Sequence, residues 1–99
     1  MTTKKATKIE RPRRKRVTFR FVAEPECDVR VAGSFNSWDA EARPLSRKNG
    51  NGTYSATLLL PPGRHEYKFV VNGEWRCDPA CPQWVPNEHG TLNSVVEVV

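Results

Sequence analysis

Short segments in which apolar and polar residues alternate, each ended by a cluster of Gly, Pro or Asn, limit what this 99-residue chain can fold into. Because successive side chains of a strand point to opposite faces of a sheet, such alternation indicates a half-buried strand. No window of about 11 residues has its apolar positions at helical spacing. We therefore predict an all-β chain, with strands at residues 17–23, 28–35, 53–60, 64–71 and 94–99.

Turn signals separate these segments. The clearest is Asn72-Gly73, which suits a type I′ hairpin turn leading into a short strand at residues 74–76. The Pro-rich residues 77–90 predict a long loop. Strands at such short intervals favour an antiparallel sandwich of two sheets. The other turn signals are residues 24–26, 36–39, 49–52 and 61–63.

The positive charge of the chain is concentrated at its beginning. Residues 1–16 hold eight Lys or Arg against Glu10 alone, a net charge of +7, whereas residues 17–99 hold eight Lys or Arg and ten Asp or Glu, a net charge of −2. With Ile9 as its one large aliphatic residue after Met1, the first segment cannot bury enough apolar surface to become ordered. We predict a disordered basic N-terminal arm at 1–16 and one folded domain at 17–99.

The basic arm raises the question of nucleic-acid binding. An arm of this charge would bind phosphates electrostatically, and the binding would fall steeply with salt. No aromatic residue is interleaved with the charges, so nothing in the arm would stack on bases. Nucleic-acid binding by the arm is therefore the least supported of the functions that the sequence suggests.

Membrane, secretory and metal-binding classes find no support in the composition. No apolar run approaches the roughly 18 residues of a membrane span, and no apolar stretch follows Met1 as in a secretory signal. The cysteines are odd in number, which indicates reduced thiols, and with two histidines they form no four-ligand zinc pattern. We expect a cytoplasmic protein without metal or cofactor.

Catalysis requires converging side chains, and the sequence offers few of them. Only His65 and His89 could act as bases, and the carboxylates fall in turns or on the solvent side of alternating strands. A body of about 80 residues supports a thin core and no deep enclosed pocket. We therefore expect a noncatalytic protein rather than an enzyme.

Three tryptophans are many for so small a body. Trp38 lies in a polar turn, Trp75 follows a hairpin turn, and Trp84 lies between prolines in the predicted loop. Exposed indole rings beside polar donors are typical of sugar-binding faces, because the ring offers a flat apolar platform to a pyranose. The same rings could instead close the ends of the sandwich, and composition alone leaves both interpretations open.

Four motifs follow one another at residues 31–38 (VAGSFNSW), 62–75 (PGRHEYKFVVNGEW), 78–79 (DP) and 90–98 (GTLNSVVEV). They resemble carbohydrate-binding module family 48, which includes the glycogen-binding domain of the AMP-activated protein kinase beta subunit and the early-set domains of branching and debranching enzymes. The resemblance covers about residues 17–99 and leaves out the basic arm. It implies an immunoglobulin-like early-set β-sandwich that binds alpha-1,4-linked glucans.

The resemblance also implies which residues bind sugar. Trp38 and Trp75 match the two stacking tryptophans of the kinase-type site, and Lys68 matches its hydrogen-bonding lysine. Thr91 and Asn93 match the polar pair of the last loop. All five fall in expected turns or on the solvent side of an expected strand. The residue pattern and the resemblance therefore indicate one surface.

Two positions depart from the family pattern. His89 stands where the kinase subunit has a leucine that inserts between sugars, so we include it in the site as a polar contact in place of an apolar one. Leu92 replaces a small or branched residue. Trp84 is a candidate third platform, and Asn36 is expected to cap the turn that presents Trp38.

We predict a monomeric, noncatalytic module that binds glycogen, starch or malto-oligosaccharides by tryptophan stacking. The alternative is a regulatory or docking module that binds a glycogen-metabolising enzyme or kinase without binding sugar itself. Soluble oligosaccharide would displace a partner held at a glucan site but not one held at a sheet edge, which separates the two hypotheses.

Overall fold

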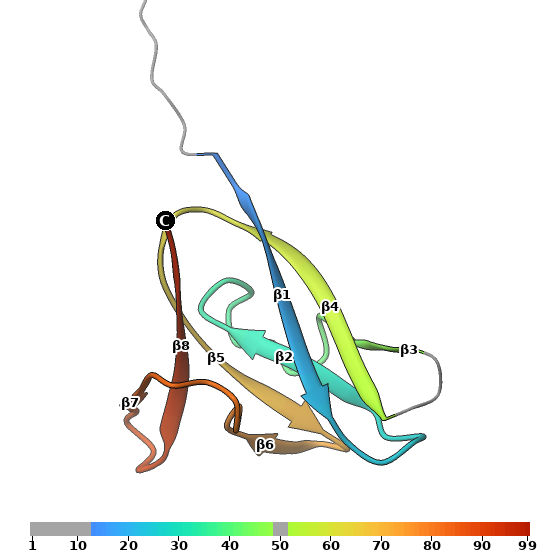
Figure 1. The fold of residues 1–99 in the computed structure, drawn as a ribbon. Helices are drawn as coiled ribbons and strands as arrows, with labels where there is room; N and C mark the ends of the chain where they lie inside the picture. Colours follow the sequence, from blue (N-terminus) through green and yellow to red (C-terminus); the bar gives the residue numbers. More distant parts are fainter. Residues whose placement is uncertain (1–12, 49–51) are drawn as a thin grey trace, which may run out of the picture.

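The computed structural model describes residues 13–48 and 52–99, which form eight strands and no helix (Figure 1). No helix that could cross a membrane therefore occurs in these two ranges. The predicted all-β class is confirmed. The strands are β1 (Lys15–Val22), β2 (Val29–Gly33), β3 (Ser46–Lys48), β4 (Thr53–Leu60), β5 (Gly63–Val71), β6 (Glu74–Arg76), β7 (Trp84–Pro86) and β8 (Leu92–Val98).

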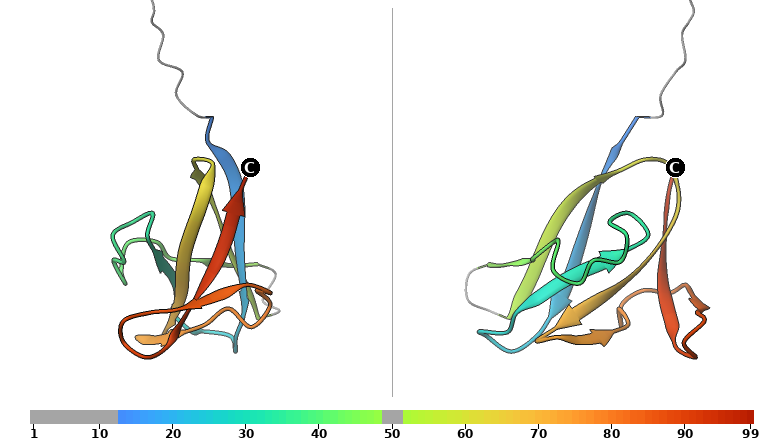
Figure 2. Two further views of the ribbon diagram at one scale, coloured as in Figure 1. Left: turned by 90° about the vertical axis from the view of Figure 1, so that its left-hand side faces the viewer. Right: turned by 180° about the vertical axis from the view of Figure 1, so that it is seen from behind.

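The strands form two antiparallel sheets (Figures 1 and 2). One sheet has the strand order β1-β4-β3, and the other has the order β2-β5-β8-β7, with β6 paired to the end of β5. Buried side chains from both sheets make one hydrophobic cluster between them. This is the predicted sandwich of two sheets.

Alternation along the strands decides which side chains enter the core. In β1, Phe19 and Phe21 are buried, whereas Thr18 before them and Arg20 between them are exposed. The centre of the core comes from β5, where Phe69 has 0% of its surface exposed and lies 4.9 Å from Phe21 between ring centroids. β5 is thus the central strand, with core on its inner face.

Neither β3 nor β7 is expected from the sequence. Both are three residues long, too short for alternation to be recognised, and β7 lies inside the 77–90 segment that was predicted as a loop. β7 pairs with β8 alone, and its Pro86 is tolerated because an edge strand does not need every backbone N–H. Pairing with β8, which only the folded chain provides, explains why β7 forms.

β1 begins at Lys15 rather than at Val17, so its first two residues pair with the end of β4 and do not belong to the basic arm. Residues 13 and 14 of the predicted arm precede β1, and residues 1–12 lie outside the described part of the chain. Residues 49–51, which make up most of a predicted turn, also lie outside it.

The hairpin turn between β5 and β6 has the predicted geometry. Asn72 and Gly73 have φ angles of 51° and 84°, and a type I′ turn requires positive φ at both of its central residues. The turn sets β6 on β5 so that Trp75 is opposite Val70. Side chains of directly opposed residues share one face, so the ring of Trp75 lies on the outer face of this sheet.

A buried phenol links the loop after β6 to the core. Tyr67 donates a hydrogen bond of 2.6 Å to the carboxylate of Asp78, and the backbone N–H of Asp78 donates to Ser94 Oγ at 3.0 Å. Burial, and then the neighbouring carboxylate of Asp78, raises the pKa of Tyr67 above its ordinary value. The folded chain therefore holds this phenol in its neutral form.

This environment predicts a loss of stability in alkali. An unfolded tyrosine ionises near pH 10, whereas folded Tyr67 keeps its proton, so above about pH 10 the unfolded state binds fewer protons and the free energy of unfolding falls as pH rises. Tyr67→Phe removes this contribution. Urea unfolding between about pH 9 and 11 should give a shallower decline for Tyr67→Phe than for the wild type, and parallel declines would contradict the assignment.

The start of the first strand, β1, and the end of the last strand, β8, lie close together. The start of β1 pairs with the end of β4, as Lys15 with Leu60, and the end of β8 pairs with the start of β5, as Val98 with Gly63. Only Pro61 and Pro62 separate the two partners, so β1 begins and β8 ends beside one turn (Figures 1 and 2).

Candidate functional site

A hollow of about 850 Å³ lies on the outer face of the β2-β5-β8-β7 sheet. It collects side chains from the loop after β2, from β5, from β6 and from the segment that leads into β8. All six sugar-binding residues named from the sequence are among its lining. The lining residues are Trp38, Glu66, Lys68, Trp75, Asn87, Glu88, His89, Thr91 and Asn93.

A tight turn after β2 presents Trp38. The carbonyl of Gly33 accepts hydrogen bonds from the backbone N–H groups of Asn36 and Trp38, at 3.1 and 2.9 Å. The Asn36 side chain accepts from the Gly33 N–H at 3.0 Å and donates to the Val31 carbonyl at 3.2 Å. Asn36 thus caps the turn, as predicted, and holds Trp38 in a left-handed conformation with φ of 58°.

The two indole rings of the hollow lie side by side. The ring centroids of Trp38 and Trp75 are 6.5 Å apart, and the ring planes are inclined by 44°. Trp75 keeps 45% of its surface exposed although it is held on a strand. The two rings therefore form an apolar wall that is open to solvent and bent in the middle.

Lys68 forms the polar part of the hollow nearest to β5. Its side chain points away from the core, as the alternation predicts, but only 8% of the residue is exposed because other residues of the hollow cover it. Its ammonium group donates to Thr91 Oγ1 at 2.9 Å. This bond fixes the ammonium beside the tryptophan wall.

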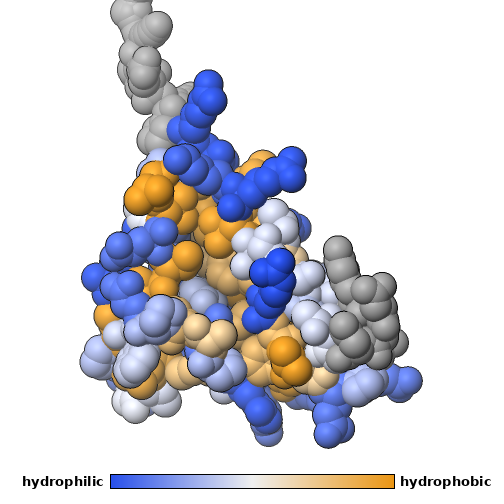
Figure 3. All heavy atoms as spheres, viewed as in Figure 1, coloured by the Kyte–Doolittle hydropathy of each residue, from blue (hydrophilic) through white to orange (hydrophobic). Residues whose placement is uncertain are grey.

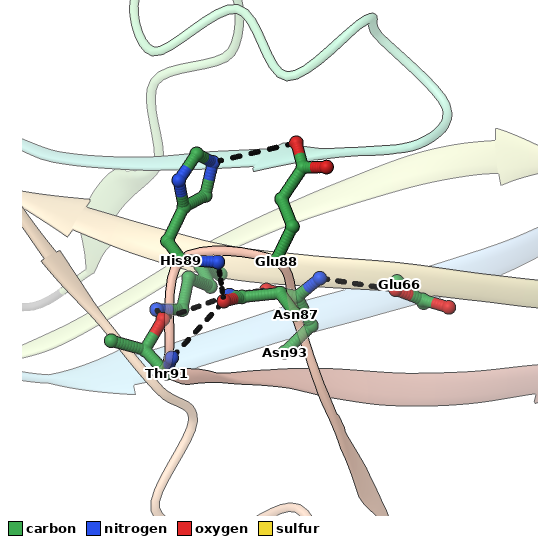
Figure 4. A network of polar contacts seen from close by, with 7 residues as sticks. Glu66, Asn87, Glu88, His89, Thr91 and Asn93 are labelled. Atoms are coloured by element: carbon green, nitrogen blue, oxygen red, sulfur yellow. Dashed lines mark hydrogen bonds and ion pairs between the residues drawn. The ribbon is translucent and has the colours of Figure 1, made fainter.

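Asn87 organises the segment before β8, and sequence reasoning missed it. Its side-chain oxygen accepts from the N–H groups of His89 and Thr91 at 2.9 and 3.1 Å, and its side-chain nitrogen donates to Thr91 Oγ1 and Asn93 Oδ1 at 2.8 and 2.9 Å (Figure 4). One amide thus holds three predicted site residues. The signal was present, because Asn three residues before Gly90 is typical of an Asx turn.

Glu66 extends this network on β5. Asn93 donates its side-chain amide to Glu66 Oε1 at 3.0 Å, so both ends of the Asn93 amide are engaged (Figure 4). Buried Asn93 is therefore held in one orientation rather than free to rotate. Glu66 was also not predicted as a site residue, because nothing in the sequence distinguishes its carboxylate from others on the solvent side of a strand.

His89 lies at the rim of the hollow. Its side chain is exposed, and its Nε2 lies 3.7 Å from a carboxylate oxygen of Glu88 (Figure 4). His89 therefore lines the hollow with less restraint than Lys68 or Asn93.

All residues that line the hollow lie in a part of the chain that matches a known family. Residues 16–99 match the family model described as the glycogen recognition site of AMP-activated protein kinase. The chain belongs to this glycogen recognition family. The matched part of the chain is accordingly a noncatalytic glycogen-binding module, as predicted.

The chain is also similar in sequence to individual known proteins. The chain is 42% identical over 71 residues to the 5'-AMP-activated protein kinase subunit beta-1 of Sus scrofa, which covers 72% of this chain and 54% of that protein. It is also 42% identical over 71 residues to the human beta-1 subunit, covering 24% of that protein. Protein FLOURY ENDOSPERM 6, chloroplastic, of rice is 40% identical over 67 residues, which are 68% of this chain and 12% of that protein. The chain thus spans about half or less of these relatives.

Trp84 does not line the hollow, contrary to its interpretation as a third platform. It is opposite Ser94 on β8, whereas Asn93, the neighbouring residue of β8, lines the hollow. Adjacent residues of a strand point to opposite faces, so Trp84 projects from the other face of this sheet, where 55% of its surface is exposed.

All three cysteines are free thiols, and within residues 13–48 and 52–99 no three His, Cys, Asp or Glu side chains gather where a metal ion could be held.

Proposed function

We propose that the hollow binds alpha-1,4-linked glucan, with the Trp38 and Trp75 rings stacked against successive glucose units. The observation that favours this most is the pair of rings, exposed Trp75 and half-buried Trp38, with centroids 6.5 Å apart beside a polar network in a glycogen recognition family. A pyranose presents a face of C–H groups that packs on an indole ring, while its hydroxyls need polar partners. The partners we propose are Lys68, His89, Thr91 and Asn93.

The inclination of the rings suits a curved ligand. Alpha-1,4 linkage makes a glucan chain coil, so the faces of successive glucose units are tilted relative to one another. Ring planes inclined by 44° can therefore each lie against a different unit. A flat, extended glucan such as a beta-linked chain would contact one ring well and the other poorly.

The polar partners are arranged before any ligand arrives. Lys68 is fixed by Thr91, and Asn93 is fixed by Asn87 and Glu66. Groups held in place lose little side-chain freedom on binding, which favours affinity. The face is open to solvent, however, so we expect a dissociation constant on the order of 10 µM to 1 mM for a single site, strengthened by avidity on branched polymer.

The module also invites a docking function. Relatives of this chain are named as subunits of a kinase, and a subunit must contact its partners. The second candidate function is therefore docking on a kinase or a glycogen-metabolising enzyme. The expected cytoplasmic location stays a prediction, and one relative is named as chloroplastic.

Co-sedimentation with glycogen tests the glucan-binding proposal. The wild-type chain should enter the glycogen pellet, and maltoheptaose should return it to the supernatant, whereas cellohexaose should not. A folded wild type that stays in the supernatant would overturn glucan binding and favour docking alone.

Asn87 offers a prediction about the polar network. Asn87→Asp keeps the acceptor oxygen for the His89 and Thr91 N–H groups but removes both donations to Thr91 and Asn93. Two lost hydrogen bonds beside a half-buried network should weaken maltoheptaose binding about tenfold while the far-ultraviolet circular dichroism stays native. Titration calorimetry measures the change, and Gln83→Glu, which also replaces a side-chain amide by a carboxylate but lies outside the hollow, is the matched control.

A further inference from the structure

A groove of about 460 Å³ lies outside the hollow described above. It shares no lining residue with the first hollow and opens between β4 and the turn that follows β2. Phe35, Leu58 and Leu60 supply apolar surface to it, and Arg14, Arg43 and His65 supply polar groups. No role in glucan binding follows from its position.

One wall of this groove is an unpaired stretch of sheet edge. β1 pairs with all eight residues of β4, but β3 pairs only with Thr53, Tyr54 and Ser55 on the other side. Among the described residues, no strand continues the line of β3 along residues 56–60 of β4. Such an edge has the backbone groups needed to accept one more strand.

Two arginines lie along this edge. Arg43 donates to the Thr57 carbonyl at 3.4 Å, and Arg14 donates to the Leu59 carbonyl at 3.3 Å. Residues two apart on a strand direct their backbone groups to the same edge, so both contacts are on one side of β4. Both bonds are long and exposed, and an incoming chain could replace them at small cost.

The chemistry of the groove is cationic at the rim and apolar at the floor. No Asp or Glu is among its lining residues, whereas two arginines and a histidine are. His65 Nε2 is 2.8 Å from the Pro61 carbonyl, which fixes its ring at one end. In Figure 3, hydrophilic and hydrophobic residues lie next to each other at the end of the molecule where β1 begins. The net charge of +7 on residues 1–16 would add long-range attraction for an anionic partner.

We infer that this groove takes an extended acidic segment of a partner protein, which adds as a strand to residues 56–60 of β4. An alternating acidic and apolar sequence would direct its carboxylates to Arg14 and Arg43 and its apolar side chains to Phe35 and Leu58. A free inorganic anion would use the arginines but neither the apolar floor nor the sheet edge. The site is independent of glucan binding.

Nuclear magnetic resonance of the ¹⁵N-labelled full chain tests this inference. The probe is a capped peptide of alternating glutamate and valine, about seven residues long. The peptide should shift the amide signals of residues 56–60. Its affinity for the chain should fall about threefold or more when NaCl is raised from about 50 to 300 mM. Saturating maltoheptaose should leave these shifts in place, so failure of either proposal can be told from failure of the other.

Matched variants and peptides decide the outcome. Arg14→Gln with Arg43→Gln should weaken peptide binding about fivefold or more, whereas Arg20→Gln with Arg64→Gln, the same change of charge outside the groove, should alter it less than about twofold. A peptide with alternate backbone N-methyl groups should not bind. Equal binding of a lysine–valine peptide, undiminished binding of the N-methylated peptide, insensitivity to the first variant, or identical shifts with inorganic phosphate would each overturn the inference.

Discussion

Replacing Trp38 and Trp75 together by alanine should lower the affinity for glycogen about a hundredfold or more and leave the protein in the supernatant of a co-sedimentation assay. Trp75→Ala alone should cost at least about 1 kcal/mol. The rings supply the apolar wall of the hollow, and the hydroxyl-binding groups that remain compete with water. Titration calorimetry with maltoheptaose, with each single variant alongside, measures both losses.

The fold should survive these substitutions. Trp75 is 45% exposed, and Trp38 lies in a turn whose hydrogen bonds come from backbone groups and Asn36 rather than from the indole ring. Trp84→Ala is the matched control, since it removes an exposed indole from the other face of the same sheet and should keep full binding. Native circular dichroism with undiminished glycogen binding by the double variant would contradict the assignment of the site.

The largest effect on stability should come from Phe69→Ala. Removing a ring from a fully buried site costs about 3–5 kcal/mol, which is most of the free energy of unfolding of a small domain. Phe69 packs on both Phe21 and Tyr67 in β1 and β5, with centroid distances of 4.9 and 5.8 Å, so the cavity would open between the two sheets. We expect a variant that is largely unfolded at about 37 °C.

Urea denaturation followed by fluorescence measures this loss. Val22→Ala is the control, because Val22 is 75% exposed and its truncation should change the free energy of unfolding by less than about 0.5 kcal/mol. Phe69→Ala should also fail to bind glycogen, because its neighbour Lys68 is placed by the same strand. Its binding loss should accompany unfolding, unlike that of the tryptophan variants. A Phe69→Ala protein as stable as Val22→Ala would contradict the proposed core.

Sequence alone could predict the long strands because each contains its own alternation. Residues 53–60 were predicted with their observed bounds, and the strand at 64–71 begins one residue earlier, at Gly63. Asn72-Gly73 needed no tertiary information either, since positive φ at two successive positions selects these residue types. The surface on which the site lies followed from the face that each strand leaves outside the core.

What the sequence could not provide were features that arise only when distant segments meet. β7 exists because β8 lies beside it, and Lys68 is buried in a hollow whose other residues, Thr91 among them, come from distant segments. The role of Asn87 depends on three partners arriving at one amide, and the role of Glu66 on the approach of Asn93. Trp84 was placed near the site because a loop has no fixed face, whereas a strand does.

The closeness of the start of β1 to the end of β8, beside the Pro61-Pro62 turn, bears on how such a module can be built into other proteins. A domain whose ends meet can be grafted into a surface loop of a host without stretching either linker. The strand ends that face the host are those of β4 and β5, whereas Trp75 and Thr91 lie toward the opposite ends of β5 and β8. In a host enzyme that carries this insertion, the hollow would point away from the enzyme and toward the polysaccharide.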